Sequence, residues 1–202
     1  MTNEAPAIVL ASASASRTKL LAAAGLVIEQ RPSAVDEGDL RDALKADGAS
    51  AEEAAMALAE LKADAISTDA PGALVIGADQ ILEADGRWFE KPDNREQARD
   101  ELRTLSGREH RLATAVCVLR DGTRLWGCAE SPRLEMREFS DEFLEAYLDR
   151  VGDAALTSVG AYQLEGAGAQ LFERIDGDFF TILGLPLLPL LNFLRAKGAL
   201  PS

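Results

Sequence analysis

Apolar and polar positions change in short blocks along the chain, and the blocks predict strands and helices mixed from one end to the other. The apolar run Ala7–Leu10 is typical of a short buried strand. Small residues follow it, and a helix is expected to begin near Ser16 and to run to Ala24, because Gly25 is a stop signal. Turn residues separate the other expected strands, which are Val27–Gln30, Ala73–Leu82, Arg87–Phe89, Leu112–Leu119, Thr123–Cys128 and Leu171–Ile175.

Capping signals mark the later helices. Ser50 with Glu53, and Asn94 with Gln97, have the three-residue spacing of a helix-capping pair. The expected helices are Ser50–Ser67, Asn94–Leu105, Ser140–Leu148 and, after a proline, Leu187–Ala196. Because strands and helices alternate with no repeat or linker, we expect a single α/β domain over residues 1–202.

The composition says more about which partners the protein can bind than about its fold. The chain has 202 residues with 5% aromatics, so Ala, Leu, Val and Ile must fill most of the core. A formal net charge of −13 argues against nucleic-acid polymers and anionic membranes as partners. It is compatible with a small anionic ligand, because a few local cations decide the field at contact range. Most of the acidic excess is expected to serve solubility.

The cysteines and the apolar stretches indicate where in the cell the protein is expected. Cys117 and Cys128 lie in apolar surroundings without metal-ligand spacing, which is typical of small buried side chains. No basic region is followed by a long apolar run near the N-terminus, so no signal peptide is expected. The longest apolar stretch, residues 182–191, contains two prolines and is too short to span a bilayer. A cytoplasmic location is expected.

One candidate for chemistry is the segment from Leu10 to Arg17, in which a strand, a loop of small residues and a helix start follow one another. A helix start exposes backbone N–H groups, to which Ser12 and Ser14 add hydroxyls and Arg17 adds a charged fork. This combination suits a phosphate, although it lacks the glycine and lysine of a Walker loop. An ordinary helix cap beside a solvated arginine is the alternative.

A second candidate interrupts an apolar strand with Asp79 and Gln80. A carboxylate inside a buried strand is costly unless it is paired or binds a metal, so such positions are often functional. The alternative is a bulge at the strand end, with Asp79 in solvent.

Isolated charged residues give weaker signals. Lys62 and Lys91 are solvated lysines by default, and Asp36 and Glu37 solvated loop acids. The single histidine, His110, has no partner motif and is expected to be structural or at the surface. Glu165 lies in a loop-like stretch, where it could read a base edge or face water.

Taken in order, the segments resemble the Maf family of nucleotide pyrophosphatases over nearly the whole chain, from residue 8 to about residue 194. The matching blocks are LASASASRTKLL, VDE, LAELKA, GADQ, EKP, LSGREH, GAYQLEG and DGDFFTILGLPL. The resemblance implies a Maf/ITPase-like fold, in which a long mixed sheet with flanking helices forms two lobes around a deep cleft. It also implies hydrolysis between the α- and β-phosphates of a nucleoside triphosphate with a divalent metal cation, Mg²⁺ or Mn²⁺, and suggests a homodimer.

The resemblance also assigns roles to residues. Ser12, Ser14 and Arg17 fall on the family's phosphate-binding loop, and Glu37, Lys62 and Lys91 on further active-site positions. Asp79 matches the family's proton acceptor, and Glu37 and Asp79 are expected to hold the metal. These roles agree with chemistry, because cations stabilise a triphosphate and carboxylate oxygens suit Mg²⁺.

Departures from the family pattern concern the substrate. Ala15 stands where the loop usually has proline, and Ser16 where it usually has a first arginine, which removes one charge contact with the nucleotide. Gln80 and Glu165 replace the threonine and glutamine of the branch that acts on dTTP and UTP. Together with LFERIDG they resemble the branch that acts on 7-methyl-GTP. A carboxylate can accept hydrogen bonds from a guanine edge.

Rival functions remain open from the sequence. A septum or cell-division regulator that acts by binding would use the cleft without needing Asp79. A broad nucleotide phosphatase would release orthophosphate first, and a pyrophosphatase could have broad or dTTP/UTP specificity. The leading hypothesis is a house-cleaning pyrophosphatase for non-standard or methylated nucleotides.

Overall fold

A computed structural model describes residues 5–201 and confirms the predicted class, a long mixed sheet with flanking helices. The described strands join in the order β2-β1-β3-β5-β7-β8, with β4 on β3 and β6 on β5. β1 is parallel to β2 and β3, whereas β4, β6, β7 and β8 pair antiparallel. The strands are β1 (Ile8–Leu10), β2 (Glu29–Gln30), β3 (Leu74–Ala84), β4 (Arg87–Phe89), β5 (Glu109–Arg120), β6 (Thr123–Glu130), β7 (Arg133–Met136) and β8 (Phe172–Asp176).

The helices follow the capping signals closely. Ser50 and Glu53 form both hydrogen bonds of a capping box, and Asn94 accepts from the backbone N–H of Gln97. The segments α2, α6, β7 and three short 3-10 helices were not predicted. The helices are α1 (Ala15–Ala23), α2 (Gly38–Ala46), α3 (Ala51–Ser67), α4 (Arg95–Leu105), α5 (Asp141–Val151), α6 (Phe179–Ile182), α7 (Leu187–Ala196) and the 3-10 helices η1 (Gly152–Thr157), η2 (Val159–Ala161) and η3 (Ala167–Leu171).

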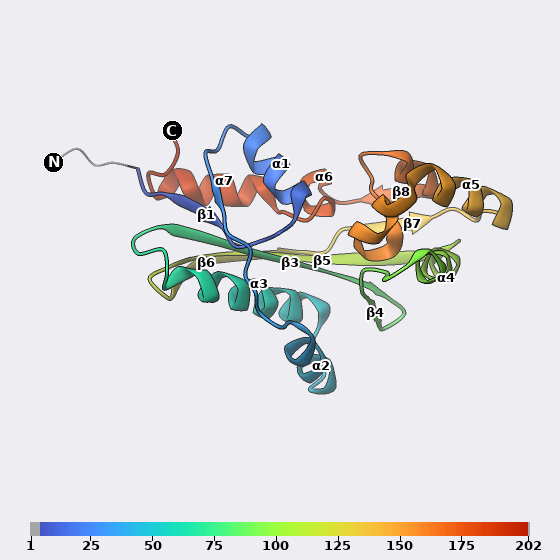
Figure 1. Ribbon diagram of the computed structural model, residues 1–202, viewed down its shortest axis with the longest axis horizontal. Helices are drawn as coiled ribbons and strands as arrows, with labels where there is room; N and C mark the ends of the chain where they lie inside the picture. Colours follow the sequence, from blue (N-terminus) through green and yellow to red (C-terminus); the bar gives the residue numbers. More distant parts are fainter. Residues whose placement is uncertain (1–4, 202) are drawn as a thin grey trace. The chain divides into compact units, whose positions relative to one another are not determined.

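The chain divides into two compact units. The first comprises the described residues up to 80, residues 114–130 and those from 184 onward, and the second comprises residues 81–113 and 131–183. Within the first unit, α3 covers one face of the strands and α1 and α7 lie on the other face (Figure 1). The single domain over the whole chain and the cleft between two lobes stay predictions.

Helix α3 packs closely against strand β3 in the first unit. A Cβ placed on Gly77 of β3 would lie 2.0 Å from the carbonyl oxygen of Ala59 and 2.8 Å from the Cβ of Ala63. Only glycine fits there, because real Cβ atoms do not come so near. Small residues on α3 and Gly77 on β3 therefore let the helix pack directly on the strand.

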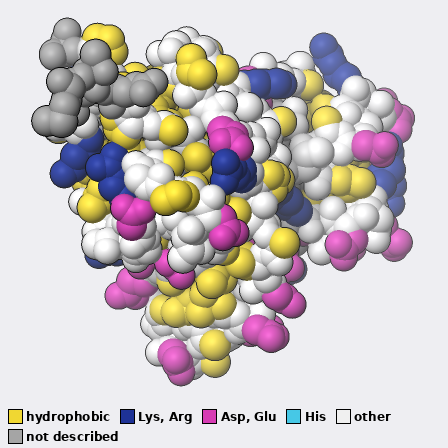
Figure 2. All heavy atoms as spheres, turned by 60° about the vertical axis from the view of Figure 1, so that its left-hand side comes forward, with side chains coloured by type: hydrophobic (Ala, Val, Ile, Leu, Met, Phe, Trp, Pro, Cys, Tyr) yellow, Lys and Arg dark blue, Asp and Glu magenta, His cyan; other side chains and the backbone are white. Residues whose placement is uncertain are grey.

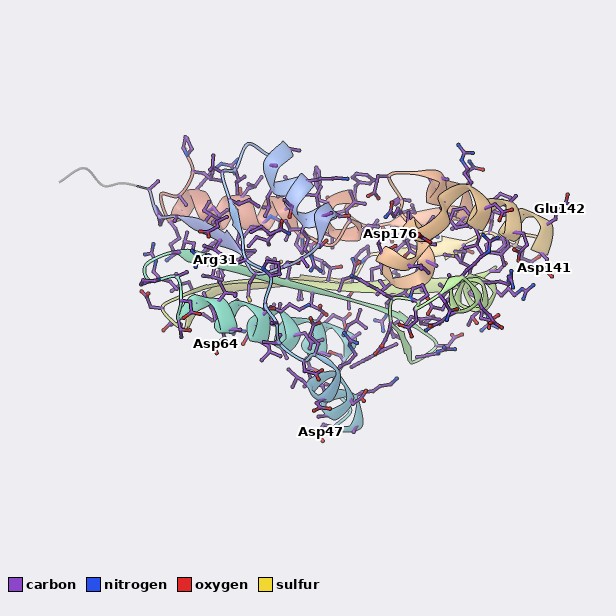
Figure 3. All side chains as sticks on the ribbon, viewed as in Figure 1. Arg31, Asp47, Asp64, Asp141, Glu142 and Asp176 are labelled. Carbon is purple, nitrogen blue, oxygen red and sulfur yellow. The ribbon has the colours of Figure 1, made fainter. Side chains whose placement is uncertain are left out.

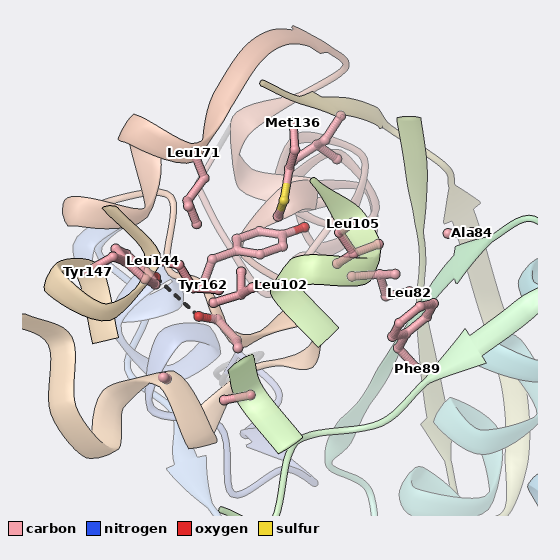
Figure 4. Packing of buried hydrophobic residues seen from close by; sticks show 14 of the residues in the cluster. Leu82, Ala84, Phe89, Leu102, Leu105, Met136, Leu144, Tyr147, Tyr162 and Leu171 are labelled. Carbon is pink, nitrogen blue, oxygen red and sulfur yellow. Dashed lines mark hydrogen bonds between the residues drawn. The ribbon is translucent and has the colours of Figure 1, made fainter. Parts of the chain in front are cut away.

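The second unit has its own apolar core, shown in Figure 4. Tyr147 packs within it and donates from its hydroxyl to the carbonyl of Ala161 at 3.1 Å. His110 is fully buried in this unit, with Nε2 2.8 Å from the hydroxyl of Tyr162, and burial lowers the pKa of His110 to about 4. Of the two expected positions for His110, structural or at the surface, the surface position is wrong because the side chain is buried.

Acidic side chains are spread over the surface, as the face in Figure 2 shows. Asp47 and Asp64 are exposed, and both point outward in Figure 3. Cys117 is buried as predicted. Cys128 is only partly buried because it lies on β6, which pairs with β5 alone among the described strands. No helix within residues 5–201 is long and apolar enough to cross a membrane.

Candidate functional site

The loop between β1 and α1 is held in place by its own hydroxyls. Ser14 is the N-cap of α1, and its side chain accepts from the backbone N–H of Arg17 at 3.4 Å. The backbone N–H of Ser14 donates to Ser12 Oγ at 3.2 Å, and Gln30 Nε2 donates to the carbonyl of Ser12 at 2.9 Å. Because Ser12 Oγ accepts from Ser14 N–H and from Arg17 Nη1, its own hydroxyl proton remains for another acceptor.

Arg17 points into the protein rather than into solvent. Its Nη1 donates to Ser12 Oγ at 3.1 Å and to the carbonyl of Ala78 at 2.9 Å, and its Nε donates to the carbonyl of Gly184 at 2.8 Å. Burial lowers the pKa of Arg17, and the charges of Asp79 and Glu37 oppose that shift. Arg17 thus connects the loop between β1 and α1, strand β3 and the segment before α7. These bonds use Nε and Nη1, so Nη2 can donate to a ligand.

Asp79 and Lys62 form a buried ion pair on the face of β3 that packs against α3. Gly77 and Asp79 are two residues apart and therefore share a face, the face against which α3 packs. That packing brings Lys62 Nζ to 2.6 Å from Asp79 Oδ1. The exposed fractions of Lys62 and Asp79 are 8% and 6%. The alternative of a solvated Asp79 is wrong, because the apolar strand continues past it to Ala84.

Glu37 completes the cluster from the start of α2. Its Oε2 lies 2.9 Å from Lys62 Nζ and 3.7 Å from Arg41 Nη2, and its side chain is 30% exposed. The ammonium of Lys62 therefore sits between two carboxylates. Asp36, its neighbour, instead accepts from the backbone N–H of Gly38 and caps the turn.

One atom of the cluster lacks a partner. Asp79 Oδ2 is buried and has no hydrogen-bond partner among residues 5–201. A buried carboxylate oxygen normally has a donor, so this oxygen is free to bind a ligand, a water or a cation. The solvated-lysine alternative for Lys62 is wrong, since the lysine holds the second oxygen of the same carboxylate.

The remaining predicted residues lie around or apart from this cluster. Gln80 Nε2 donates to Thr114 Oγ1 at 2.8 Å, so its amide is held on β5. Ser16 is half-buried in the first turn of α1. Lys91 and Glu165 are exposed residues of the second unit, and their part in the site stays a prediction.

Backbone groups of the site could not be found from side-chain chemistry. The carbonyls of Ala78 and Gly184 hold Arg17, and a carbonyl has no signature in a sequence. Gly184 has φ +103°, so the chain there adopts a conformation that favours glycine and turns its carbonyl to the arginine. The DGDFFTILGLPL block therefore contributes a backbone acceptor.

Chemically, the first unit gathers hydroxyls, a helix N-terminus, a cationic nitrogen and a carboxylate with one unbonded oxygen. The donors suit a phosphate, and the carboxylate suits a proton acceptor or a cation ligand. The residues that provide them come from the loop between β1 and α1, from α1 itself and from β3, so the fold assembles them from separate parts of the sequence.

Comparison with known proteins identifies the family. The model of the family described as Maf-like protein matches residues 7–197, so the chain belongs to the Maf family. A protein of Granulibacter bethesdensis named nucleoside triphosphate pyrophosphatase is 51% identical over 193 residues, which is 96% of this chain and 98% of that protein. A protein of Rhodospirillum rubrum with the same name is 52% identical and covers 98% of each chain. A protein of Rhizobium meliloti named 7-methyl-GTP pyrophosphatase is 49% identical over 98% of this chain and 99% of that protein.

Proposed function

We propose that this chain hydrolyses a nucleoside triphosphate between its α- and β-phosphates and releases a nucleoside monophosphate and diphosphate. Relatives that cover it almost end to end are named nucleoside triphosphate pyrophosphatases, so the expected hydrolase acting on acid anhydrides is confirmed. The observation that carries the proposal is the buried Lys62–Asp79 pair, whose second carboxylate oxygen lacks a partner within the described residues.

Each group of the cluster has a task in this reaction. Asp79 takes the proton of the attacking water, a step that requires a carboxylate near the phosphates. Lys62 holds that carboxylate through one oxygen and offers positive charge. The Ser12 hydroxyl and Arg17 Nη2 donate to phosphate oxygens, where negative charge shifts in the transition state.

A divalent cation is part of the proposal, and the carboxylates of the first unit are its candidate ligands. Among the described residues there is no group of three or more His, Cys, Asp or Glu that could hold a metal. Two carboxylates, with Asp79 Oδ2 unbonded, still fit Mg²⁺, which is commonly held by one or two carboxylates together with substrate phosphates. Asp79 and Glu37 would hold the cation, which when bound neutralises charge on the phosphates.

The nucleotide base is the finer part of the proposal. Two of the relatives at 46–49% identity are named 7-methyl-GTP pyrophosphatase. The sequence resemblance implies the same branch for Gln80 and Glu165. We therefore favour 7-methyl-GTP over UTP. If Glu165 accepts from guanine N–H groups, Glu165→Gln should lower turnover of 7-methyl-GTP by about tenfold and leave that of UTP nearly unchanged. Equal losses for both nucleotides would remove this role from Glu165.

Product analysis tests the function itself. The protein is incubated with a panel of nucleoside triphosphates and Mg²⁺ or Mn²⁺, and the products are separated by chromatography. Equal amounts of monophosphate and diphosphate are expected. Orthophosphate as the first product would favour the broad phosphatase, and binding without any product would favour the regulatory role in septum formation.

Location and assembly belong to the same proposal. A cytoplasmic location follows from the substrate, since nucleoside triphosphates are used there. A homodimer is the assembly that the family resemblance suggests, and the elution volume in size-exclusion chromatography measures it.

A further inference from the structure

A cavity in the second unit is lined by β4 and by one face of α4. Its volume is about 330 Å³, and Arg87 of β4 lines it together with Gln97, Glu101 and Thr104 of α4. The three α4 residues are four and three positions apart, so they follow one another along the same face of the helix. The cavity shares no residue with the site proposed above.

Glu101 brings to this cavity a carboxylate oxygen that no protein group satisfies. The residue is 4% exposed, and its Oε2 has no hydrogen-bond partner among residues 5–201. Its Oε1 accepts from Gln97 Nε2 at 3.5 Å, and Gln97 Oε1 accepts in turn from the backbone N–H of Asp93 at 3.0 Å. A buried carboxylate oxygen normally has a donor, so Oε2 calls for one from outside the chain.

Arg87 lines the same cavity but does not pair with Glu101. Its charge acts on the Glu101 carboxylate, yet no ion pair within 4.0 Å joins the two in the described part of the chain. The guanidinium instead lies over the ring of Phe89, with Cζ 4.6 Å from the ring centroid. A cation and an anion therefore line one cavity without contact, and each can still bind a group of opposite charge.

The electrostatic surroundings let Glu101 ionise near neutral pH. Burial raises the pKa of Glu101 to about 7, Arg87 and the Gln97 hydrogen bond oppose the shift, and Asp93 and Glu90 add to it. A donor bound at Oε2 favours the carboxylate further, because a hydrogen bond to the charged form of an acid stabilises that form. Binding of such a donor is therefore coupled to the ionisation of Glu101.

We propose that this cavity binds a small zwitterion of the α-amino acid class, whose ammonium donates to Glu101 Oε2 and whose carboxylate pairs with Arg87. One carbon separates the two charges of such a molecule, which suits protein charges that interact but lie more than 4.0 Å apart. An anion alone is disfavoured, because Glu96 and Asp100 also line the cavity. A metal ion is disfavoured, since residues 5–201 contain no group of three or more His, Cys, Asp or Glu that could hold one. The volume lies at the lower end of the range of small-molecule sites.

The test is a titration of ¹⁵N-labelled protein with glycine, followed through the backbone amide resonances of α4. Methylammonium and acetate, which carry one charge each, are titrated in parallel. The dissociation constant for glycine should be at least about tenfold lower than that for either single-charge probe, because two charge-assisted contacts act together. It should also fall about tenfold from about pH 6 to about pH 8, as Glu101 ionises.

Three variants locate the ligand. Glu101→Gln and Arg87→Gln should each weaken glycine binding by about tenfold or more. Glu96→Gln, the same change at an exposed position that also lines the cavity, should alter it by less than about twofold. Resonances outside α4 and β4 that keep their positions show that each variant is folded.

Several results would overturn the proposal. Methylammonium or acetate that binds as tightly as glycine would indicate a site for one charge, and the absence of any shift would leave Oε2 to water. Glycine binding that survives Glu101→Gln would place the ligand elsewhere. The comparison of the three probes uses the wild type, so it decides the matter even if a variant fails to fold. None of these outcomes bears on the proposed hydrolysis, because the titration measures no activity.

Discussion

Removal of the Lys62 ammonium should lower the stability of the protein, because Lys62 pairs with both Asp79 and Glu37. Lys62→Met keeps the length of the side chain but takes away the cation that lies 2.6 Å from Asp79 and 2.9 Å from Glu37. Asp79 is 6% exposed, and breaking a buried pair costs about 3–5 kcal/mol because a buried charge loses its partner. Glu37 has a 30% exposed side chain, so water replaces most of what it loses, and its coupling to Lys62 should stay below about 1 kcal/mol.

Two double-mutant cycles measure both couplings on the same lysine. One combines Lys62→Met with Asp79→Asn and the other with Glu37→Gln, and the free energy of unfolding comes from urea titration. Trp126 lies in the same unit as the site and reports its unfolding in a Trp88→Phe background. We expect a coupling of about 3 kcal/mol for Asp79 and under about 1 kcal/mol for Glu37. Equal couplings, or an Asp79 coupling below about 1 kcal/mol, would refute the reasoning from burial.

Three further changes test other contacts. Arg17→Lys should destabilise the protein by about 3 kcal/mol in urea titration, because the single nitrogen of an ammonium cannot reach the three acceptors that Nε and Nη1 of the planar guanidinium contact. An unchanged stability would contradict that network. Gly77→Ala should cost about 3 kcal/mol because its Cβ would lie 2.0 Å from the oxygen of Ala59, whereas Gly38→Ala has room and serves as the control. The raised pKa of Glu101 means that the folded protein binds the proton more tightly than the unfolded chain, so stability should fall as pH rises from about 4.5 to about 7, by up to about 3 kcal/mol, and Glu101→Gln should remove this slope. A slope that persists in the variant would show that other groups cause it.

The fold could be predicted where local chemistry decides it. The Ser50 capping box, the hairpin turn at Asp85-Gly86 and the helix after Pro186 appear in the structure close to the predicted positions. The strand β7 was missed because its four residues are too few for alternation to stand out. The helix α2 was missed because its apolar face is only Leu40, Ala43 and Leu44, little more than one turn, and none of its residues is fully buried.

The clustering of some candidate residues could be predicted, but their bonding could not. The family resemblance implied that Ser12, Arg17, Lys62 and Asp79 act together, and the structure brings these four into one unit, whereas the roles of all the site residues stay predictions. The sequence could not show that Arg17 faces inward, because this depends on the carbonyls of residues 78 and 184, which have no side-chain signature. Nor could it show the pairing of Lys62 with Asp79, which depends on the close approach of α3 at Gly77.

The most direct test of the central claim is the rate of diphosphate release from a nucleoside triphosphate by Asp79→Asn. Asp64→Asn, the same change at an exposed position of the same unit, is the control. If Asp79 accepts the proton of the attacking water, kcat should fall by about a hundredfold or more in Asp79→Asn, with nucleotide still bound, and should be unchanged in Asp64→Asn. Near wild-type turnover by Asp79→Asn would contradict the account.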